Sequence, residues 1–72
     1  MRITHVAAIL LAGYLGFYNG YLALWNHAGS APDHIFPYRA ETYSDADKDA
    51  LARGIPFDTR EELTRLLEDY LS

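Results

Sequence analysis

The stretch Tyr14–Trp25, YLGFYNGYLALW, decides the fold of this 72-residue chain. Asn19 and Gly20 stand near its centre, and both residue types accept the positive φ angles that a two-residue type I′ turn requires. A turn at this point predicts a β-hairpin in which Tyr18 lies directly opposite Tyr21.

The two faces of this hairpin differ in chemical character. One face is wholly aliphatic or phenylalanine, and its members are Leu15, Phe17, Leu22 and Leu24. The other face carries every side chain with a polar tip, and its members are Tyr14, Gly16, Tyr18, Tyr21, Ala23 and Trp25. A strand pair with one buried face requires this kind of sorting. A helix is the competing interpretation, because the aromatic residues of the stretch also recur at helical spacing.

The residues after the hairpin predict a loop, a third strand and a helix. The loop is the polar run at positions 26–33, NHAGSAPD. The strand is predicted over 34–38, and Pro37 places it at an edge of the sheet because proline has no N–H for the ladder. Ser44 is a good N-cap for a helix over Asp45–Arg53, and Gly54 suits the left-handed position that ends it.

A second helix is predicted over Arg60–Leu71. The preceding segment 55–57 is expected to be extended, because Pro56 disfavours helix at the residue before it. Thr59 with Glu62 three residues later is a capping box. The leucines of this segment and Tyr70 recur at helical spacing and form one apolar stripe.

The predicted fold is therefore α+β. It is a small three-stranded antiparallel sheet, made of the hairpin and the third strand, packed against two C-terminal helices in one domain at residues 13–72. The chain is short enough to bury only about 60% of its unfolded surface, so its stability should be modest. The expected core comprises Leu15, Phe17, Leu22, Leu24, Ile35, Leu51, Ile55, Phe57, Leu63, Leu66, Leu67 and Tyr70.

Residues 1–12 form an apolar lead. Arg2 is followed by seven consecutive apolar residues at positions 6–12, a pattern similar to the front of a signal peptide or membrane anchor. Seven residues are too few to span a bilayer, which takes about 20. Two interpretations stay open: a signal-anchor that brings a membrane contact and an extracytoplasmic location, or a short helix folded into a cytoplasmic domain.

Composition and motifs argue against several kinds of function. The net charge is −4, with +1 in residues 1–40 and −5 in residues 41–72, whereas nucleic-acid binding calls for a basic stripe. The nearest approach to a metal site, His27 with Asp33 and His34, matches no known ligand spacing. No nucleophile, phosphate-binding or dinucleotide motif occurs. We therefore predict no enzyme activity and no catalytic, cofactor-binding or metal-binding residue.

The candidate binding residues are Tyr14, Tyr18, Tyr21 and Trp25. Tyrosine and tryptophan are favoured at protein and membrane interfaces because each has an apolar body and a polar tip. An exposed aromatic face would bind a partner, whereas a covered one would be core, and both interpretations stay open.

With these elements in place, residues 13–71 resemble the C-terminal domain of the bypass-of-forespore C (BofC) family. The resemblance rests on the YLGFYNGYLALW hairpin, the ALARGIPF helix end and the final TREELTRLLEDY. It implies a three-stranded sheet packed with helices, and a negative regulator of a proteolytic sporulation checkpoint, exported from the forespore of spore-forming Firmicutes. The family's separate N-terminal domain has no counterpart among these residues, which leaves the checkpoint role in question. The resemblance brings no catalytic residue.

Two functions follow as expectations. The first is a non-enzymatic regulatory module, exported or membrane-tethered, that binds another protein through the aromatic face or through the edge that carries Pro37. The second is a small structural protein in the cytoplasm that self-associates, as a homodimer that completes its core.

Overall fold

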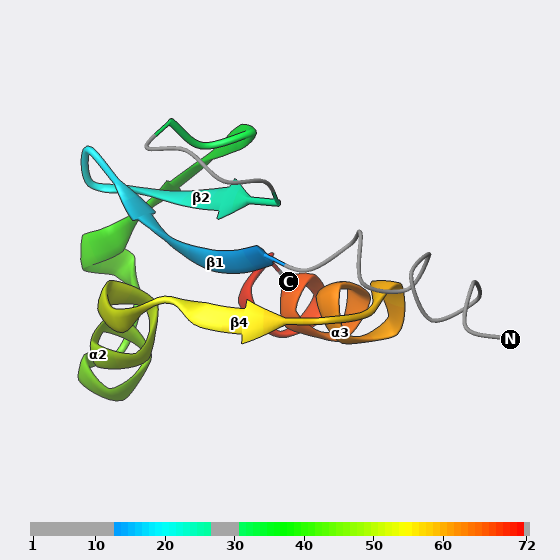
Figure 1. Cartoon of the computed structure of the whole chain (residues 1–72). Coiled ribbons are helices and arrows are strands. Elements are labelled where there is room, and N and C mark those ends of the chain that lie inside the picture. Colours follow the sequence, from blue (N-terminus) through cyan, green and yellow to red (C-terminus); the bar gives the residue numbers. More distant parts are fainter. Residues whose placement is uncertain (1–12, 27–30, 72) are drawn as a thin grey trace, which may run out of the picture.

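The computed structural model describes residues 13–26 and 31–71. Its elements, in chain order, are β1 (Gly13–Tyr18), β2 (Tyr21–Trp25), β3 (His34–Arg39), the 3-10 turn η1 (Ala40–Thr42), α2 (Asp45–Arg53), β4 (Ile55–Phe57) and α3 (Arg60–Leu71) (Figure 1). The apolar lead at residues 1–12 lies outside the described residues, and so do both interpretations of it.

The hairpin has the predicted turn and register. Asn19 has a φ of 53° and Gly20 a φ of 83°, as a type I′ turn requires. Tyr18 pairs with Tyr21 at the turn, and the pairing continues without interruption to the end of β2. The hairpin interpretation of this stretch is confirmed, and the helical one is wrong.

The sheet of the described residues has four strands in the order β3-β2-β1-β4, one strand more than predicted. The additional strand is the segment expected to be extended, which pairs antiparallel with β1 through Leu15–Ile55 and Gly13–Phe57. Gly54, with a φ of 87°, ends α2 and redirects the chain along β1. Sequence reasoning gave the conformation of this segment but not its pairing, which depends on where α2 packs.

Strand β3 lies at the opposite edge of the sheet, as Pro37 predicted. Its pairing with β2 is irregular: Ala23 lies opposite Ile35 and Tyr21 opposite Arg39. The chain of β3 thus contains two more residues than β2 over this interval, because four positions separate the partners on β3 and two separate those on β2. Pro37 falls within the irregular stretch, where a missing N–H costs the ladder least.

Both helices begin with the predicted caps. The hydroxyl of Ser44 accepts a hydrogen bond from the Asp47 amide at 3.2 Å, and the hydroxyl of Thr59 accepts one from the Glu62 amide at 3.1 Å. The Glu62 carboxylate accepts from the amide of Asp58 at 2.6 Å, one residue earlier than in a standard capping box. The Glu62 side chain therefore holds Asp58, the residue before the cap, against the first turn of α3.

The core forms between the aliphatic face of the hairpin and the helices. Leu15, Leu22 and Leu51 are fully buried and in contact. The partly buried hydrophobic residues packed against them are Phe17, Leu24, Phe36, Tyr43, Ile55, Leu66, Leu67, Tyr70 and Leu71. Because four of these belong to α3, this helix covers the aliphatic face of the sheet.

Two members of the expected core lie elsewhere. Ile35 is 49% exposed, because its pairing with Ala23 places it on the aromatic face; Phe36, the next residue of β3, packs into the core instead. Leu63 is only half-buried and lies outside the core cluster. β3 was predicted correctly as a strand but with its opposite face toward the core. The predicted stripe of α3 does face the core, and only Leu63, in the first turn of the helix, lies outside the cluster.

Tyrosine hydroxyls attach the end of α3 to the rest of the domain. Tyr43 donates a hydrogen bond to the carbonyl oxygen of Tyr70 at 2.7 Å, and Tyr38 donates one to the carbonyl oxygen of Leu71 at 3.0 Å. The Tyr43 ring also lies between those of Phe17 and Tyr70, with centroids 6.1 Å away in each case. These contacts satisfy carbonyl groups that the last turn of a helix leaves without partners.

Candidate functional site

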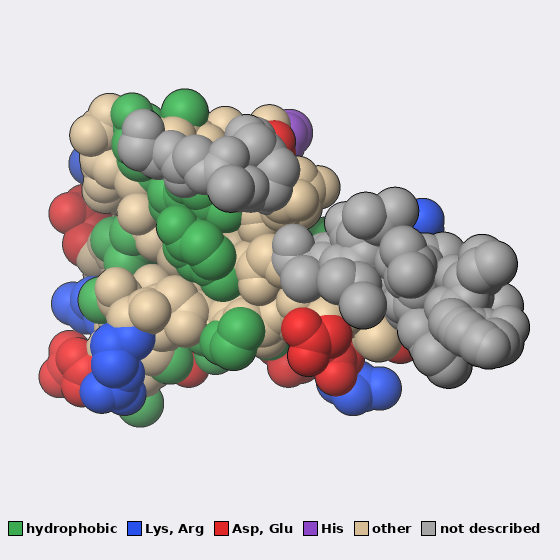
Figure 2. All heavy atoms as spheres, viewed as in Figure 1, with side chains coloured by type: hydrophobic (Ala, Val, Ile, Leu, Met, Phe, Trp, Pro, Cys, Tyr) green, Lys and Arg blue, Asp and Glu red, His purple; other side chains and the backbone are tan. Residues whose placement is uncertain are grey.

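The face of the sheet opposite α3 is the candidate binding surface, and we call it the outer face. Residues that are cross-strand partners share a face. The pairings therefore place on it the side chains of Tyr14, Tyr18, Tyr21, Ala23, Trp25, Ile35 and Pro56, together with Gly16. In the space-filling view, hydrophobic side chains gather over β1 and β2 (Figure 2).

The structure brings all four predicted binding residues together but gives them different roles. Tyr14, Tyr18 and Tyr21 are 40%, 36% and 37% exposed, whereas Trp25 is only 6% exposed. The Trp25 ring stacks on Tyr14 with centroids 4.8 Å apart and meets Tyr18 edge-on at 6.2 Å. Trp25 thus supports two of the exposed tyrosines, Tyr14 and Tyr18. Ile35 adds a further exposed apolar side chain that the sequence did not assign to this face.

An arginine lies at the turn end of the outer face. The guanidinium carbon of Arg39 is 6.0 Å from the centroid of the Tyr21 ring, and its Nη1 is 3.4 Å from a carboxylate oxygen of Glu41. Stacking of this kind keeps a tyrosine ring in place and brings positive charge to the edge of an apolar surface.

A shallow depression of about 500 Å³ lies at the other part of the outer face, where the end of α2 meets the sheet. Its lining consists of Tyr14, Gly16, Phe17, Trp25, Ala52, Arg53, Gly54 and Pro56. Glycine at position 16 permits this arrangement, because a Cβ atom there would lie 3.0 Å from the carbonyl oxygen of Leu51. The Leu51 side chain enters the core, whereas its carbonyl oxygen lies against Gly16. The end of α2 therefore packs beside β1 and forms one wall of the depression.

The edges of the sheet are less suited to binding than its outer face. Strand addition requires a run of free backbone N–H and C=O groups along an edge. The β3 edge contains Pro37 and the irregular stretch, and the β4 edge is three residues long with Pro56 at its centre. Each edge therefore offers a partner only a short, interrupted ladder.

No arrangement for metal binding exists among the described residues, in which no three His, Cys, Asp or Glu side chains form a group. The His34 ring meets Phe36 edge-on with centroids 4.5 Å apart. The Asp33 carboxylate accepts a hydrogen bond from the backbone N–H of Asn26 at 2.7 Å and so joins the two ends of the connection between β2 and β3. His27, the third member of the weak candidate ligand set, lies outside the described residues.

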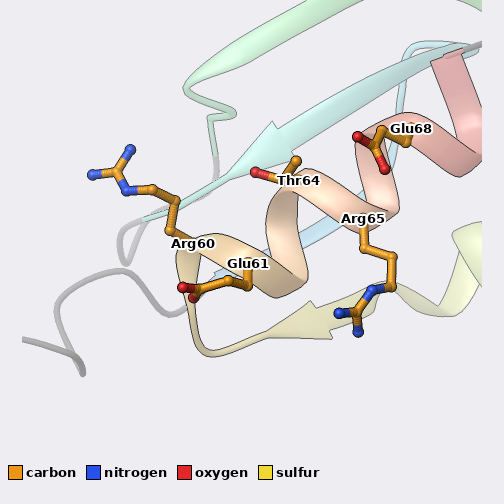
Figure 3. A pocket seen from close by; sticks show the side chains of 5 residues that line it. All are labelled: Arg60, Glu61, Thr64, Arg65 and Glu68. Atoms are coloured by element: carbon orange, nitrogen blue, oxygen red, sulfur yellow. The ribbon is translucent and has the colours of Figure 1, made fainter.

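A second depression, of about 310 Å³, lies on the exposed side of α3. It is lined by Arg60, Glu61, Thr64, Arg65 and Glu68, all of them exposed. Their side chains spread around the helix, and Arg60 and Arg65 point to different sides of it (Figure 3). A group of long solvated side chains that do not converge on a common point has no means to hold a ligand.

Within residues 13–26 and 31–71, the two titratable groups with a shifted pKa, Tyr43 and Tyr70, belong to the structural contacts at the end of α3. Burial raises the pKa of Tyr43 above its ordinary value of 10.0, and the neighbouring Tyr38, Asp47 and Tyr70 raise it further. Burial also raises the pKa of Tyr70, with added contributions from Asp47 and Asp69. Each shift favours the neutral phenol, and Tyr43 needs this form to donate its hydrogen bond.

Comparison with known proteins adds no relative: no protein-family model, no curated protein and no solved structure matches the chain. Among residues 13–26 and 31–71, no helix is both long and apolar enough to cross a membrane.

Proposed function

We propose that this protein is a non-enzymatic interaction module that binds a partner protein through its outer face. The observation that carries the proposal is the group of three exposed tyrosines on a single face of the sheet, two of which rest on one buried tryptophan. Rigid aromatic side chains supply a large contact area and lose little conformational freedom on binding, and this favours them at the centres of interfaces.

The surroundings of the tyrosines suit this role. Tyr14 and Tyr18 each contact the Trp25 ring, and Tyr21 contacts the Arg39 guanidinium, so each ring is held before a partner arrives. Preorganisation of this kind reduces the entropy lost on association. From the sequence resemblance to the C-terminal domain of BofC proteins we further propose a regulatory role, in an exported or membrane-tethered protein, in which binding blocks or recruits the partner.

The test replaces tyrosines while it keeps the sheet intact. Tyr18 and Tyr21 are direct cross-strand partners, so the double variant Tyr18→Thr, Tyr21→Thr substitutes a pair with good strand propensity. The matched control is Thr64→Ala with Glu68→Ala on the exposed side of α3, far from the sheet pairings. Tagged forms of all three proteins are used to isolate partners from the native cells.

We expect the double tyrosine variant to lose the partner that the parent protein and the α3 control both retain, with the circular dichroism spectrum unchanged. A partner retained equally by all three proteins would show that the outer face is not the site. Light scattering on the same samples separates a foreign partner from a second copy, because only self-association makes the mass depend on protein concentration and on the two tyrosines.

A further inference from the structure

The depression beside Arg53 indicates what kind of partner segment the outer face binds. Its surface is mostly apolar, and the Tyr14 ring and Pro56 form its aromatic and aliphatic parts. The Tyr14 ring lies so close to the Gly54 backbone that a Cβ there would be 3.1 Å from its Cδ2 atom. An open depression lined by aromatic and proline side chains is the kind of surface on which an extended peptide packs.

The charge of this depression is positive. Arg53 is its only ionisable lining residue apart from Tyr14, and none of the carboxylates in the described part of the chain forms an ion pair with it. The other guanidinium near this face, that of Arg39, lies at the turn end and is paired with the Glu41 carboxylate at 3.4 Å, so Arg53 supplies the positive charge at the depression. A guanidinium beside an apolar groove favours a ligand that carries a carboxylate at the matching position.

A second copy of this chain is a poor occupant. Three tyrosines exposed by about two fifths and one half-exposed isoleucine present roughly 300 to 400 Å² of apolar side chain. A standard protein interface buries about 800 Å² on each partner, of which roughly 450 Å² is apolar, so the apolar side chains of the outer face fall short of a standard interface. Each copy also carries a net charge of −4, so two copies repel each other. The area and the charge both favour a short segment over a folded domain.

The short, interrupted edges of the sheet favour a partner segment that contains proline. Strand addition would need free ladder groups, and Pro37 and Pro56 interrupt both edges. A polyproline II segment needs no such ladder, because its backbone stays solvated and its rings pack on aromatic side chains. It is also extended before binding and therefore loses little entropy.

We infer that the depression lined by Tyr14, Arg53 and Pro56 binds an extended, proline-containing peptide segment that carries a carboxylate opposite Arg53. This inference rests on the proposed function and adds the chemical class of the partner segment. Tyr14 and Pro56 contact the proline rings, and Arg53 pairs with an aspartate or glutamate of the peptide.

The test is an unbiased selection of random 12-residue peptides displayed on phage against the immobilised full-length protein. We expect the enriched sequences to contain prolines and at least one acidic residue. The best sequence is then synthesised, labelled and titrated by fluorescence anisotropy against the parent protein, Arg53→Glu, and the control Arg60→Glu on α3. Charge reversal at position 53 should weaken binding roughly tenfold, because it turns an attraction into a repulsion. The control should bind like the parent.

A reversed-charge peptide completes the test. With its acidic residue replaced by lysine, the peptide should bind Arg53→Glu better than it binds the parent protein. Failure to enrich any peptide, enrichment without proline or acidic residues, or equal binding to the parent and Arg53→Glu would overturn the inference. Enriched peptides without proline or acidic residues whose binding is lost in the Tyr18→Thr, Tyr21→Thr variant would overturn the inference and leave the proposed function standing. Binding to vesicles of anionic lipid in place of peptides would overturn both.

Discussion

Replacing Gly16 by valine tests how closely the end of α2 and the Gly54 backbone pack against β1. On an exposed strand this change stabilises, because glycine is a poor strand former and valine a good one. At position 16 the space is already occupied: a Cβ would lie 3.0 Å from the carbonyl oxygen of Leu51 and 3.5 Å from a ring carbon of Trp25. Two further methyl groups have no free volume to enter.

The size of the effect follows from these two opposing contributions. Overpacking a close-packed site costs about 1 to 3 kcal/mol, and the gain in strand propensity recovers up to about 1 kcal/mol. The net expectation is a loss of about 1 to 2 kcal/mol in the free energy of unfolding. For a domain of this size, the midpoint of thermal unfolding should fall by roughly 5 to 15 °C.

Thermal unfolding followed by circular dichroism measures this loss. The matched control is Ala52→Val, which adds the same two methyl groups to an exposed position beside the same depression. Only the propensity difference, about 0.5 kcal/mol, should be lost there. A Gly16→Val protein at least as stable as the parent would refute the close packing of α2 on the sheet.

Three further predictions concern single residues. Tyr43→Phe removes the hydrogen bond to the Tyr70 carbonyl and should cost about 1 kcal/mol in denaturant unfolding at pH 7. Burial raises the pKa of Tyr43 above 10.0, so the stability that its neutral hydroxyl contributes should be complete below pH 10 and should be lost as the pH rises further. Tyr43→Phe should therefore lose less stability at alkaline pH than the parent, and identical curves of stability against pH would contradict this. Ser44→Ala and Thr59→Ala each remove a helix cap and should each cost about 1 kcal/mol, measured by urea unfolding, so that no change in either variant would argue against the capping bonds. The Cβ added by Gly20→Ala meets no atom within 4 Å, but the residue keeps a φ of 83°, which L side chains rarely adopt. The strain alone should lower the free energy of unfolding by roughly 1 kcal/mol, and a variant as stable as the parent would contradict the type I′ turn.

Local sequence signals were sufficient for most of the fold. The Asn19–Gly20 turn fixed the hairpin register, and the caps at Ser44 and Thr59 fixed where both helices begin, because each depends on neighbours in the chain. The pairing of β4 with β1 and the rotation of β3 depend on contacts between distant segments. A loop of eight residues between β2 and β3 leaves their register open, and this is why Ile35 was expected in the core.

The sequence predicted which aromatic residues share the candidate site but not which of them are buried. Period-two alternation placed Tyr14, Tyr18, Tyr21 and Trp25 on one face, and the structure shows them there. Alternation cannot distinguish which aromatic ring lies beneath the others, so the burial of Trp25 needed the stacking geometry. Arg53 and Pro56 join the site only through the turn at Gly54 and the pairing of β4, and no local pattern signals either contact.

Site-specific photo-crosslinking in the native cells tests the central claim most directly. A photoreactive phenylalanine analogue is placed at Tyr18 on the outer face, and in a separate protein at Thr64 on the exposed side of α3. The account predicts a discrete crosslinked partner from position 18 that disappears when Tyr21→Thr is added, and no such product from position 64. The same partner from position 64, or none from position 18, would contradict a binding role for the outer face.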